Sequence, residues 1–153
     1  MKKYFNIWLL LCLAATAFTF SKIQQRKAAI LNHVALSVVD LRKSTAFYKN
    51  IIRLDSIAEP FKDGKHNWFK IGERSQLHLI ESAKEITQHD KGTHVCFTVP
   101  SIEDVMSRLE SSKIPYENWT GTSNTSTTRP DGVKQIYFKD PDGFWVEINN
   151  DKY

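Results

Sequence analysis

One plan occurs twice in this chain. The segments that start at His33 (HVALSV) and His94 (HVCFTV) are near copies, and each is followed by a helical pattern and then by further strand-like segments. A repeat of this size indicates a pseudo-symmetric domain in which each half supplies one curved sheet. With 153 residues, the chain is long enough for one such domain with a substantial core.

The first half reads as a strand, a helix and three further strands. Apolar and polar residues alternate over residues 31–39, and Asp40 is a good N-cap for the helix that follows. One face of that helix is apolar, with Leu41, Phe47, Tyr48, Ile51 and Ile52. Turn residues then separate strand candidates at 55–58, 67–71 and 76–81.

The second half repeats this order. Alternation over residues 93–99 predicts a strand, and Ser101 is the expected N-cap of a helix that Pro115 ends. The apolar stripe of this helix comprises Ile102, Val105, Met106 and Leu109. Residues 120–128 are polar and are expected to form a mobile loop, before strands at 134–138 and 144–149.

These elements predict an α+β fold built from two βαβββ modules. The modules cover about residues 30–82 and 92–150, within one domain over residues 30–151.

The N-terminus has a different character. Lys2 and Lys3 precede an uncharged apolar run over residues 7–20, and Ala15-Thr-Ala17 resembles a signal-peptidase site. We predict a signal peptide over residues 1–20, cleavage near Ala17, a linker over residues 21–29, and export to the periplasm or the medium. The run is short for a spanning helix, so no stable membrane insertion is expected after cleavage. An uncleaved signal would leave the protein anchored.

Charge and cysteine content exclude several classes of protein. The net charge is +4, and the basic residues form no stripe with interleaved aromatics, which argues against a nucleic-acid partner. Cys12 lies in the predicted signal, so Cys96 is alone in the mature chain and cannot form an internal disulfide. We interpret Cys96 as core filler rather than as a nucleophile.

Strand parity singles out four residues that could bind a metal. His33 and His94 lie opposite the apolar residues of their strands, and so do His78 and Glu147 in the last strand of each half. Two facing sheets could bring these four side chains together. Imidazoles with one carboxylate suit divalent Fe, Mn, Ni or Zn, and an open position on the metal would take a small-molecule substrate.

Other aromatic residues are less informative. His66 and His89 lie in turn-rich segments and are expected to be exposed to solvent. Trp68, Trp119 and Trp145 could line a substrate pocket or seal the ends of the sheets. Trp145 is the best pocket candidate, because it shares the face of Glu147.

Two phrases of the sequence resemble a known superfamily. The opening NHVALSVVDL over residues 32–41, with Ala46-Phe-Tyr48, and the closing FKDPDGFWVEI over residues 138–148 resemble the ends of vicinal oxygen chelate proteins. That superfamily includes glyoxalase I, fosfomycin-resistance thiol transferases, extradiol dioxygenases and bleomycin-binding proteins. The resemblance implies two βαβββ modules that form a cupped mixed sheet around a divalent metal.

The resemblance also implies roles for the four candidate ligands. His33, His94 and Glu147 match the shared metal triad, and His78 matches a fourth position that glyoxalase I fills with a glutamate. A metal-dependent enzyme for a small oxygen-bearing substrate is therefore expected, with Glu147 or His78 moving a proton. Proteins of this size in the superfamily are often homodimers, so His33 is contributed either across an interface or within one chain.

The reaction stays open at this level. A glyoxalase-like lyase or isomerase is favoured, although His78 departs from the glyoxalase pattern. An extradiol-type dioxygenase and a fosfomycin-type thiol or epoxide resistance enzyme are alternatives, and Ala35 stands where the fosfomycin enzymes usually carry a hydroxyl residue. A protein that sequesters a ligand without turnover is the alternative from another class.

Overall fold

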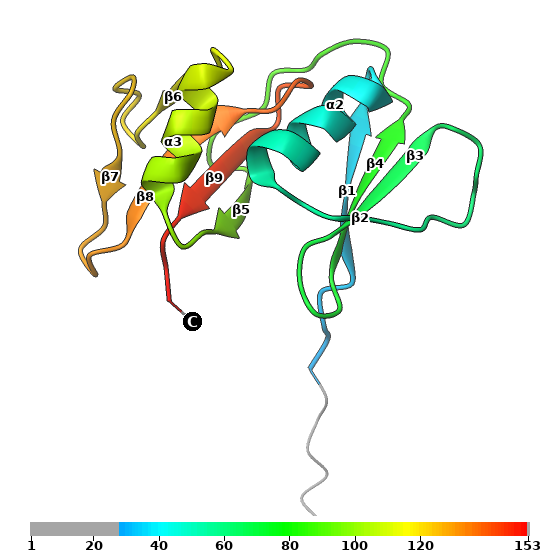
Figure 1. Ribbon diagram of the computed structural model, residues 1–153, viewed down its shortest axis with the longest axis horizontal. Coiled ribbons are helices and arrows are strands. Elements are labelled where there is room, and N and C mark those ends of the chain that lie inside the picture. Colours follow the sequence, from blue (N-terminus) through cyan, green and yellow to red (C-terminus); the bar gives the residue numbers. More distant parts are fainter. Residues whose placement is uncertain (1–27, 153) are drawn as a thin grey trace, which may run out of the picture. The chain divides into compact units, whose positions relative to one another are not determined.

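The protein forms two sheets, each packed against its own helix (Figure 1). The structure is a computed structural model that describes residues 28–152, and the compact unit considered below begins at Leu31. The predicted signal peptide, its cleavage site near Ala17 and nearly all of the linker lie outside the described residues. No helix in the described range combines the length and apolarity that crossing a membrane requires.

The first half contains one strand, a helix and three more strands. Its elements are β1 (His33–Val38), α2 (Leu41–Phe47), the π-helical turn η1 (Tyr48–Ile52), β2 (Ser56–Ile57), β3 (His66–Lys70) and β4 (Gln76–Glu81). The strand order in the sheet is β1-β4-β3-β2, with β1 parallel to β4 and the other pairs antiparallel.

The second half has the same order with one addition. Its elements are β5 (His94–Thr98), α3 (Ile102–Ser111), β6 (Tyr116–Glu117), β7 (Thr127–Thr128), β8 (Lys134–Lys139) and β9 (Trp145–Asn149). The order is β5-β9-β8-β6, and β7 pairs with β8. The predicted α+β class with two βαβββ modules is confirmed. The prediction of a mobile loop over residues 120–128 is wrong at its end, because Thr127 and Thr128 pair with β8.

Both predicted helix starts are confirmed. The Asp40 carboxylate accepts hydrogen bonds from the backbone N–H groups of Arg42 and Lys43 at 3.0 Å each, and Ser101 Oγ accepts one from Asp104 at 3.1 Å. The first helix changes to π-helical geometry at Tyr48, which the apolar stripe did not reveal. Pro115 does not end the second helix, since α3 stops at Ser111, before Lys113 adopts a left-handed conformation with φ 54°.

One apolar core joins the two halves. It includes Leu36 and Val38 of β1, which are buried, while His33, Ala35 and Ser37 are exposed on the opposite face. Helix α2 packs on β3 and β4, and α3 packs on β8, so each helix covers one face of its sheet. The predicted parity of β1 is therefore confirmed, and the face away from the helices is the one that carries the candidate ligands.

Candidate functional site

The two candidate ligands of the first half have the same relative positions on neighbouring strands as those of the second half. In the first half, His78 pairs with Ala35, two residues beyond His33 on β1. In the second half, Glu147 pairs with Cys96, two residues beyond His94 on β5. Because neighbouring strands lie about 4.8 Å apart and alternate residues share a face, each pair of ligands lies diagonally across two adjacent strands.

The second half brings a carboxylate against an imidazole. His94 Nε2 lies 3.1 Å from Glu147 Oε2, and Glu147 is only 7% exposed. The other ring nitrogen, His94 Nδ1, lies 2.8 Å from the carbonyl oxygen of Lys91. A carbonyl oxygen only accepts hydrogen bonds, so Nδ1 carries a proton and the direction of Nε2 is set.

Four polar groups surround the Glu147 carboxylate. Tyr137 Oη donates to Oε2 at 2.6 Å, while Cys96 Sγ donates to Oε1 at 3.3 Å and Asn149 Nδ2 donates to Oε1 at 3.2 Å. With His94, these contacts occupy both carboxylate oxygens. Glu147 is therefore held in one orientation.

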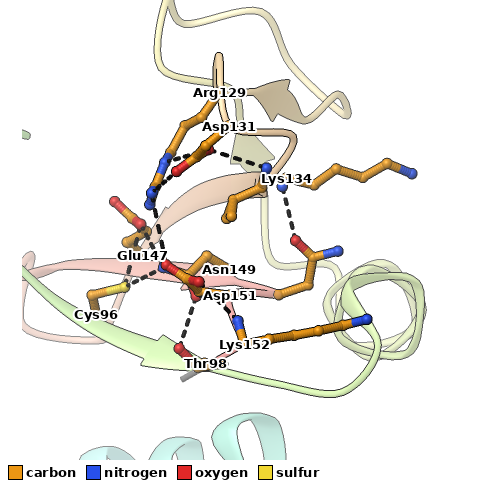
Figure 2. A network of polar contacts seen from close by, with 11 residues as sticks. Cys96, Thr98, Arg129, Asp131, Lys134, Glu147, Asn149, Asp151 and Lys152 are labelled. Atoms are coloured by element: carbon orange, nitrogen blue, oxygen red, sulfur yellow. Dashed lines mark hydrogen bonds and ion pairs between the residues drawn. The ribbon is translucent and has the colours of Figure 1, made fainter.

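The contacts of Glu147 continue into a wider polar network (Figure 2). Thr98 Oγ1 donates to Asn149 Oδ1 at 2.8 Å, and the backbone N–H of Asp151 donates to the same oxygen at 3.2 Å. Asp151 in turn lies 3.7 Å from the guanidinium of Arg129. The network fixes Asn149, which donates to Glu147.

Both weak acids next to Glu147 stay protonated at neutral pH. Burial raises the pKa of Tyr137, and its hydrogen bond to Glu147 and the charge of that carboxylate raise it further. Partial desolvation of the sulfur and the charge of Glu147 raise the pKa of Cys96 to about 12. Cys96 is thus a thiol rather than a nucleophilic thiolate, and its exposure on the ligand face corrects the prediction that it fills the core.

The first half stacks three rings across three strands. The ring of His78 lies parallel to Trp68, with centroids 3.9 Å apart and planes 2° apart, and parallel to His33, with centroids 4.3 Å apart and planes 8° apart. His78 Nε2 lies 2.8 Å from Gln76 Oε1, and His33 Nδ1 lies 2.7 Å from Asn32 Oδ1. Burial, followed by the nearby imidazoles of His33 and His66, lowers the pKa of His78, which favours a neutral ring.

The structure brings the four candidates together as two pairs and not as one cluster. Among residues 28–152, no three His, Cys, Asp or Glu side chains are close enough together to hold a metal ion.

The expectation that His66 and His89 are exposed is wrong. His66 stacks on Phe61 with centroids 4.3 Å apart, and His89 stacks on Phe144 with centroids 4.1 Å apart, so both rings are half-buried.

The three tryptophans lie in different surroundings. Trp68 belongs to the ring stack of the first half. Trp119 is 49% exposed and contacts the Tyr137 ring, with centroids 5.5 Å apart. Trp145 lines two cavities, of about 530 Å³ and 420 Å³. Trp145 is the tryptophan that strand parity indicates as the best pocket candidate, because it shares the face of Glu147.

Sequence reasoning missed three residues of the second half-site: Tyr137, Asn149 and Gln135. Gln135 Nε2 donates to the Tyr137 hydroxyl, and that hydroxyl donates to Glu147. The signal was available in the strand predicted at 134–138, where Tyr137 and Gln135 alternate with the apolar Ile136 and Phe138. Strand parity is enough to place Tyr137 and Gln135 on the face opposite these apolar residues. That Tyr137 lies beside Glu147 follows only from the register between β8 and β9.

The donor set suits a divalent transition metal. Nitrogen from His94 and oxygen from Glu147 are adjacent, and the second nitrogen of His94 is tied to a carbonyl oxygen, as in many metal-ligating imidazoles. His33 has the same feature, because its Nδ1 contacts the amide oxygen of Asn32. In His94 and in His33 the contact at Nδ1 therefore leaves Nε2 as the nitrogen that could bind a metal ion.

Comparison with known proteins identifies the family. The family model for the Glyoxalase/Bleomycin resistance protein/Dioxygenase superfamily matches residues 30–148. Lactoylglutathione lyase from Pseudomonas putida is 24% identical over 151 residues, which cover 78% of this chain and 83% of that protein. Metallothiol transferase FosB from Staphylococcus saprophyticus is 28% identical over 127 residues, which cover 78% of this chain and 75% of that protein.

Solved structures have the same fold. The fosfomycin resistance protein FosX from Listeria monocytogenes superposes with a TM-score of 0.64 at 22% identity, over 82% of this chain and 96% of that one. A glyoxalase/dioxygenase from Nostoc punctiforme gives a TM-score of 0.65 at 24% identity, over 85% and 94%. The repeated βαβββ plan, the register of the ligand pairs and the family match lead to one conclusion. The chain belongs to the Glyoxalase/Bleomycin resistance protein/Dioxygenase superfamily.

Proposed function

We propose that this protein is an exported, divalent-metal-dependent enzyme that acts on a small oxygen-bearing substrate, with a glyoxalase-like lyase or isomerase reaction favoured. The relatives described above include a lyase and a transferase, which supports catalysis by this chain. The charged start and apolar run of the N-terminus support export.

The contact between His94 and Glu147 carries the proposal. When Nδ1 of His94 donates to the Lys91 carbonyl, the neutral imidazole has only a lone pair at Nε2. That lone pair faces a carboxylate oxygen at 3.1 Å in a half-buried setting. Two acceptors at this distance repel each other unless a positive charge lies between them. A proton or a metal ion satisfies this requirement, and the second ligand pair of the repeat favours the metal.

A second copy of the chain would complete the metal site. Strands β1 and β5 each lie at the end of their sheet and pair on one side only, so their free edges are available for pairing. An apolar cavity of about 530 Å³ is lined by Val34 and Leu36 of β1 and by Val95 and Phe97 of β5. A partner that pairs with these free edges would bury the cavity and bring its own ligand pair to the pair of the first copy. We therefore propose a homodimer in which His33 and His78 of one copy meet His94 and Glu147 of the other.

The residues of the chain then have separate tasks. The bound ion would polarise a substrate oxygen and favour loss of a neighbouring proton. Glu147 would take up that proton at Oε1, the carboxylate oxygen that does not face His94. Tyr137 and Asn149 hold the carboxylate in place, and the stack of Trp68, His78 and His33 fixes the ring planes of the two histidines.

Metal binding by the full chain tests the proposal. Protein stripped with a chelator is titrated with Mn, Fe, Ni or Zn ions, and we expect one ion per subunit. Glu147→Gln removes the charge but keeps the size, so it should weaken metal binding by at least about 10-fold. Glu85→Gln changes an exposed carboxylate and should leave the affinity unchanged. Equal affinity of Glu147→Gln and the wild type would refute the metal site.

Turnover by the metal-loaded protein distinguishes the reaction classes. The adduct of a 2-oxoaldehyde with a thiol tests the lyase or isomerase reaction, a catechol tests ring-opening oxygenation, and an epoxide with a thiol tests transfer. We expect turnover of the first, and its loss in Glu147→Gln. Tight binding of a ligand without turnover of any of the three would indicate a sequestering protein instead.

A further inference from the structure

Two lysines contact the same indole ring, that of Trp145. This ring lies on the face of the second sheet that also carries His94 and Glu147. The Nζ atoms of Lys91 and Lys139 each lie 5.0 Å from the ring centroid of Trp145. Lys91 Nζ also lies 5.8 Å from the ring centroid of Tyr137. Ammonium groups at this distance from an indole are attracted by its negative face, which fixes their positions.

Only one of these two cations has an acidic partner among the described residues. Lys91 forms an ion pair with Glu117 and donates to the carbonyl oxygens of Asn118 at 3.3 Å and Trp119 at 3.1 Å. Lys139 forms no ion pair within residues 28–152, and its Nζ donates to Gln88 Oε1 at 2.8 Å. Lys139 is also half-buried. The surplus positive charge of this region therefore belongs to Lys139.

A cavity next to Lys139 extends to Tyr137, the residue that donates a hydrogen bond to Glu147. It measures about 420 Å³, and its walls include Lys139, Trp145, Glu117 and Tyr137. Tyr137 forms both part of this wall and the 2.6 Å hydrogen bond to Glu147. A group bound in this cavity would thus contact a residue that holds Glu147 in place.

The sheet register gives the distance along the strands between Lys139 and the position of Glu147. Lys139 pairs with Trp145, and Tyr137 pairs with Glu147, so the two pairs are successive positions on one face of β8 and β9. Alternate residues on a strand are about 7 Å apart. A molecule of three to five heavy atoms in a chain can span that distance.

We propose that Lys139 binds an anionic group of the substrate, a carboxylate or a phosphoryl group, while the oxygens at the other end of the substrate reach Glu147. This inference rests on the proposed function for the reaction end and assigns the substrate class, a small organic anion. Charge balance agrees with it, because a divalent ion on Glu147 next to the unpaired Lys139 leaves the face positive. An anion reduces this excess of positive charge.

Binding of simple anions to the metal-free full chain tests the site independently of the metal. Isothermal titration with inorganic phosphate and with acetate measures each affinity, and the tighter probe identifies the anion class. Lys139→Met keeps a long apolar stem on Trp145 without the charge, and we expect it to weaken anion binding at least 10-fold. Lys134→Met alters an exposed lysine on the same strand and should bind as the wild type does. Lys139→Arg keeps the charge and should retain binding within about threefold.

The possible results separate this inference from the proposed function. Absence of binding of both anions to the wild type, or equal binding to Lys139→Met, would overturn the anion site. Glu147→Gln should bind anions normally in the metal-free protein but should bind Mn²⁺ poorly. Conversely, Lys139→Met should keep the Mn²⁺ affinity within about twofold. If Lys139→Met fails to fold, loss of anion binding in Lys139→Gln with normal Mn²⁺ affinity gives the same answer, and unchanged anion binding there overturns it.

Discussion

Two glycines end the same tripeptide, Pro-Asp-Gly, but lie in different surroundings. Gly132 and Gly143 both adopt left-handed backbone conformations, with φ of 86° and 90°. A Cβ on Gly132 would meet nothing within 4 Å, whereas a Cβ on Gly143 would lie 2.2 Å from the carbonyl oxygen of Thr87. The segment that links the two halves thus passes directly over the second turn, and only a residue without a side chain leaves room for it.

Replacing each glycine by alanine should separate the two contributions. Gly132→Ala has only the backbone cost and should destabilise the fold by about 1 kcal/mol. Gly143→Ala adds a clash with backbone and should cost about 2–4 kcal/mol. Urea unfolding at constant pH measures both values from the shift in midpoint. Equal losses in the two variants would show that Thr87 does not pack on Gly143.

At the scale of elements, a buried acidic turn joins the two halves of the molecule. Tyr48 Oη in η1 donates to Asp140 Oδ2 at 2.9 Å, and Ser44 Oγ in α2 donates to Asp142 Oδ2 at 2.5 Å. The backbone N–H of Val39 donates to Asp142 Oδ1 at 2.7 Å. These bonds attach the first helix to the β8–β9 turn, in a place where apolar packing alone would leave its orientation free.

The pKa of Asp140 makes this junction dependent on pH. Burial raises it to about 6, and the charge of Asp142 raises it as well, while hydrogen bonds from Tyr48 and the backbone oppose the change. The folded pKa lies above the unfolded value of 3.8, so the folded state binds more protons between pH 4 and pH 6. This group therefore stabilises the fold fully below pH 4, and its contribution is lost as the pH rises to 6.

Asp140→Asn should remove that part of the pH dependence. The free energy of unfolding of the variant minus that of the wild type should become more positive between pH 4 and pH 7, by up to about 3 kcal/mol for about two pKa units, because only the wild type loses stability as the pH rises. Urea titrations at a series of pH values measure the difference. Asp55→Asn changes an exposed aspartate and serves as the control. If the difference in free energy of unfolding between Asp140→Asn and the wild type stays constant with pH, the raised pKa does not belong to Asp140.

At the scale of the whole molecule, the separate ligand pairs predict complementation between inactive chains. In a dimer that shares its sites, His33→Ala and Glu147→Ala each damage both sites of their homodimers. A mixed dimer keeps one intact site, formed by the unchanged His33 of one chain and the unchanged Glu147 of the other. Unfolding an equimolar mixture and refolding it should restore metal binding to about a quarter of the wild-type sites, because half of the dimers are mixed and each regains one of two sites.

Separate refolding of each variant is the control for this experiment and should restore no metal binding. If the mixture also regains none, although each variant folds and dimerises, each site is formed within a single chain. Sedimentation of the wild type gives the oligomeric state independently. A wild type that is monomeric and still binds one metal ion would likewise contradict the shared site.

Local sequence patterns predicted most of the elements. Alternation identified β1, β4, β5, β8 and β9 within one or two residues, and caps identified the starts of α2 and α3. The strand candidate at 55–58 contains β2, but the two-residue strands β6 and β7 were not predicted, because two residues are too few to show a period. The switch to π-helical geometry at Tyr48 was also missed, since an apolar stripe does not distinguish one helical pitch from another over a single turn.

The sequence by itself determined the repeated βαβββ plan and the face on which His33, His78, His94 and Glu147 lie, because strand parity is a local property of the chain. Only the tertiary structure decided which of them meet. It joined His33 to His78 and His94 to Glu147, placed Tyr137 against the carboxylate, and left Lys139 without an acidic partner among the described residues. These outcomes depend on register and packing between distant segments, and no periodicity within a segment encodes the distance to another.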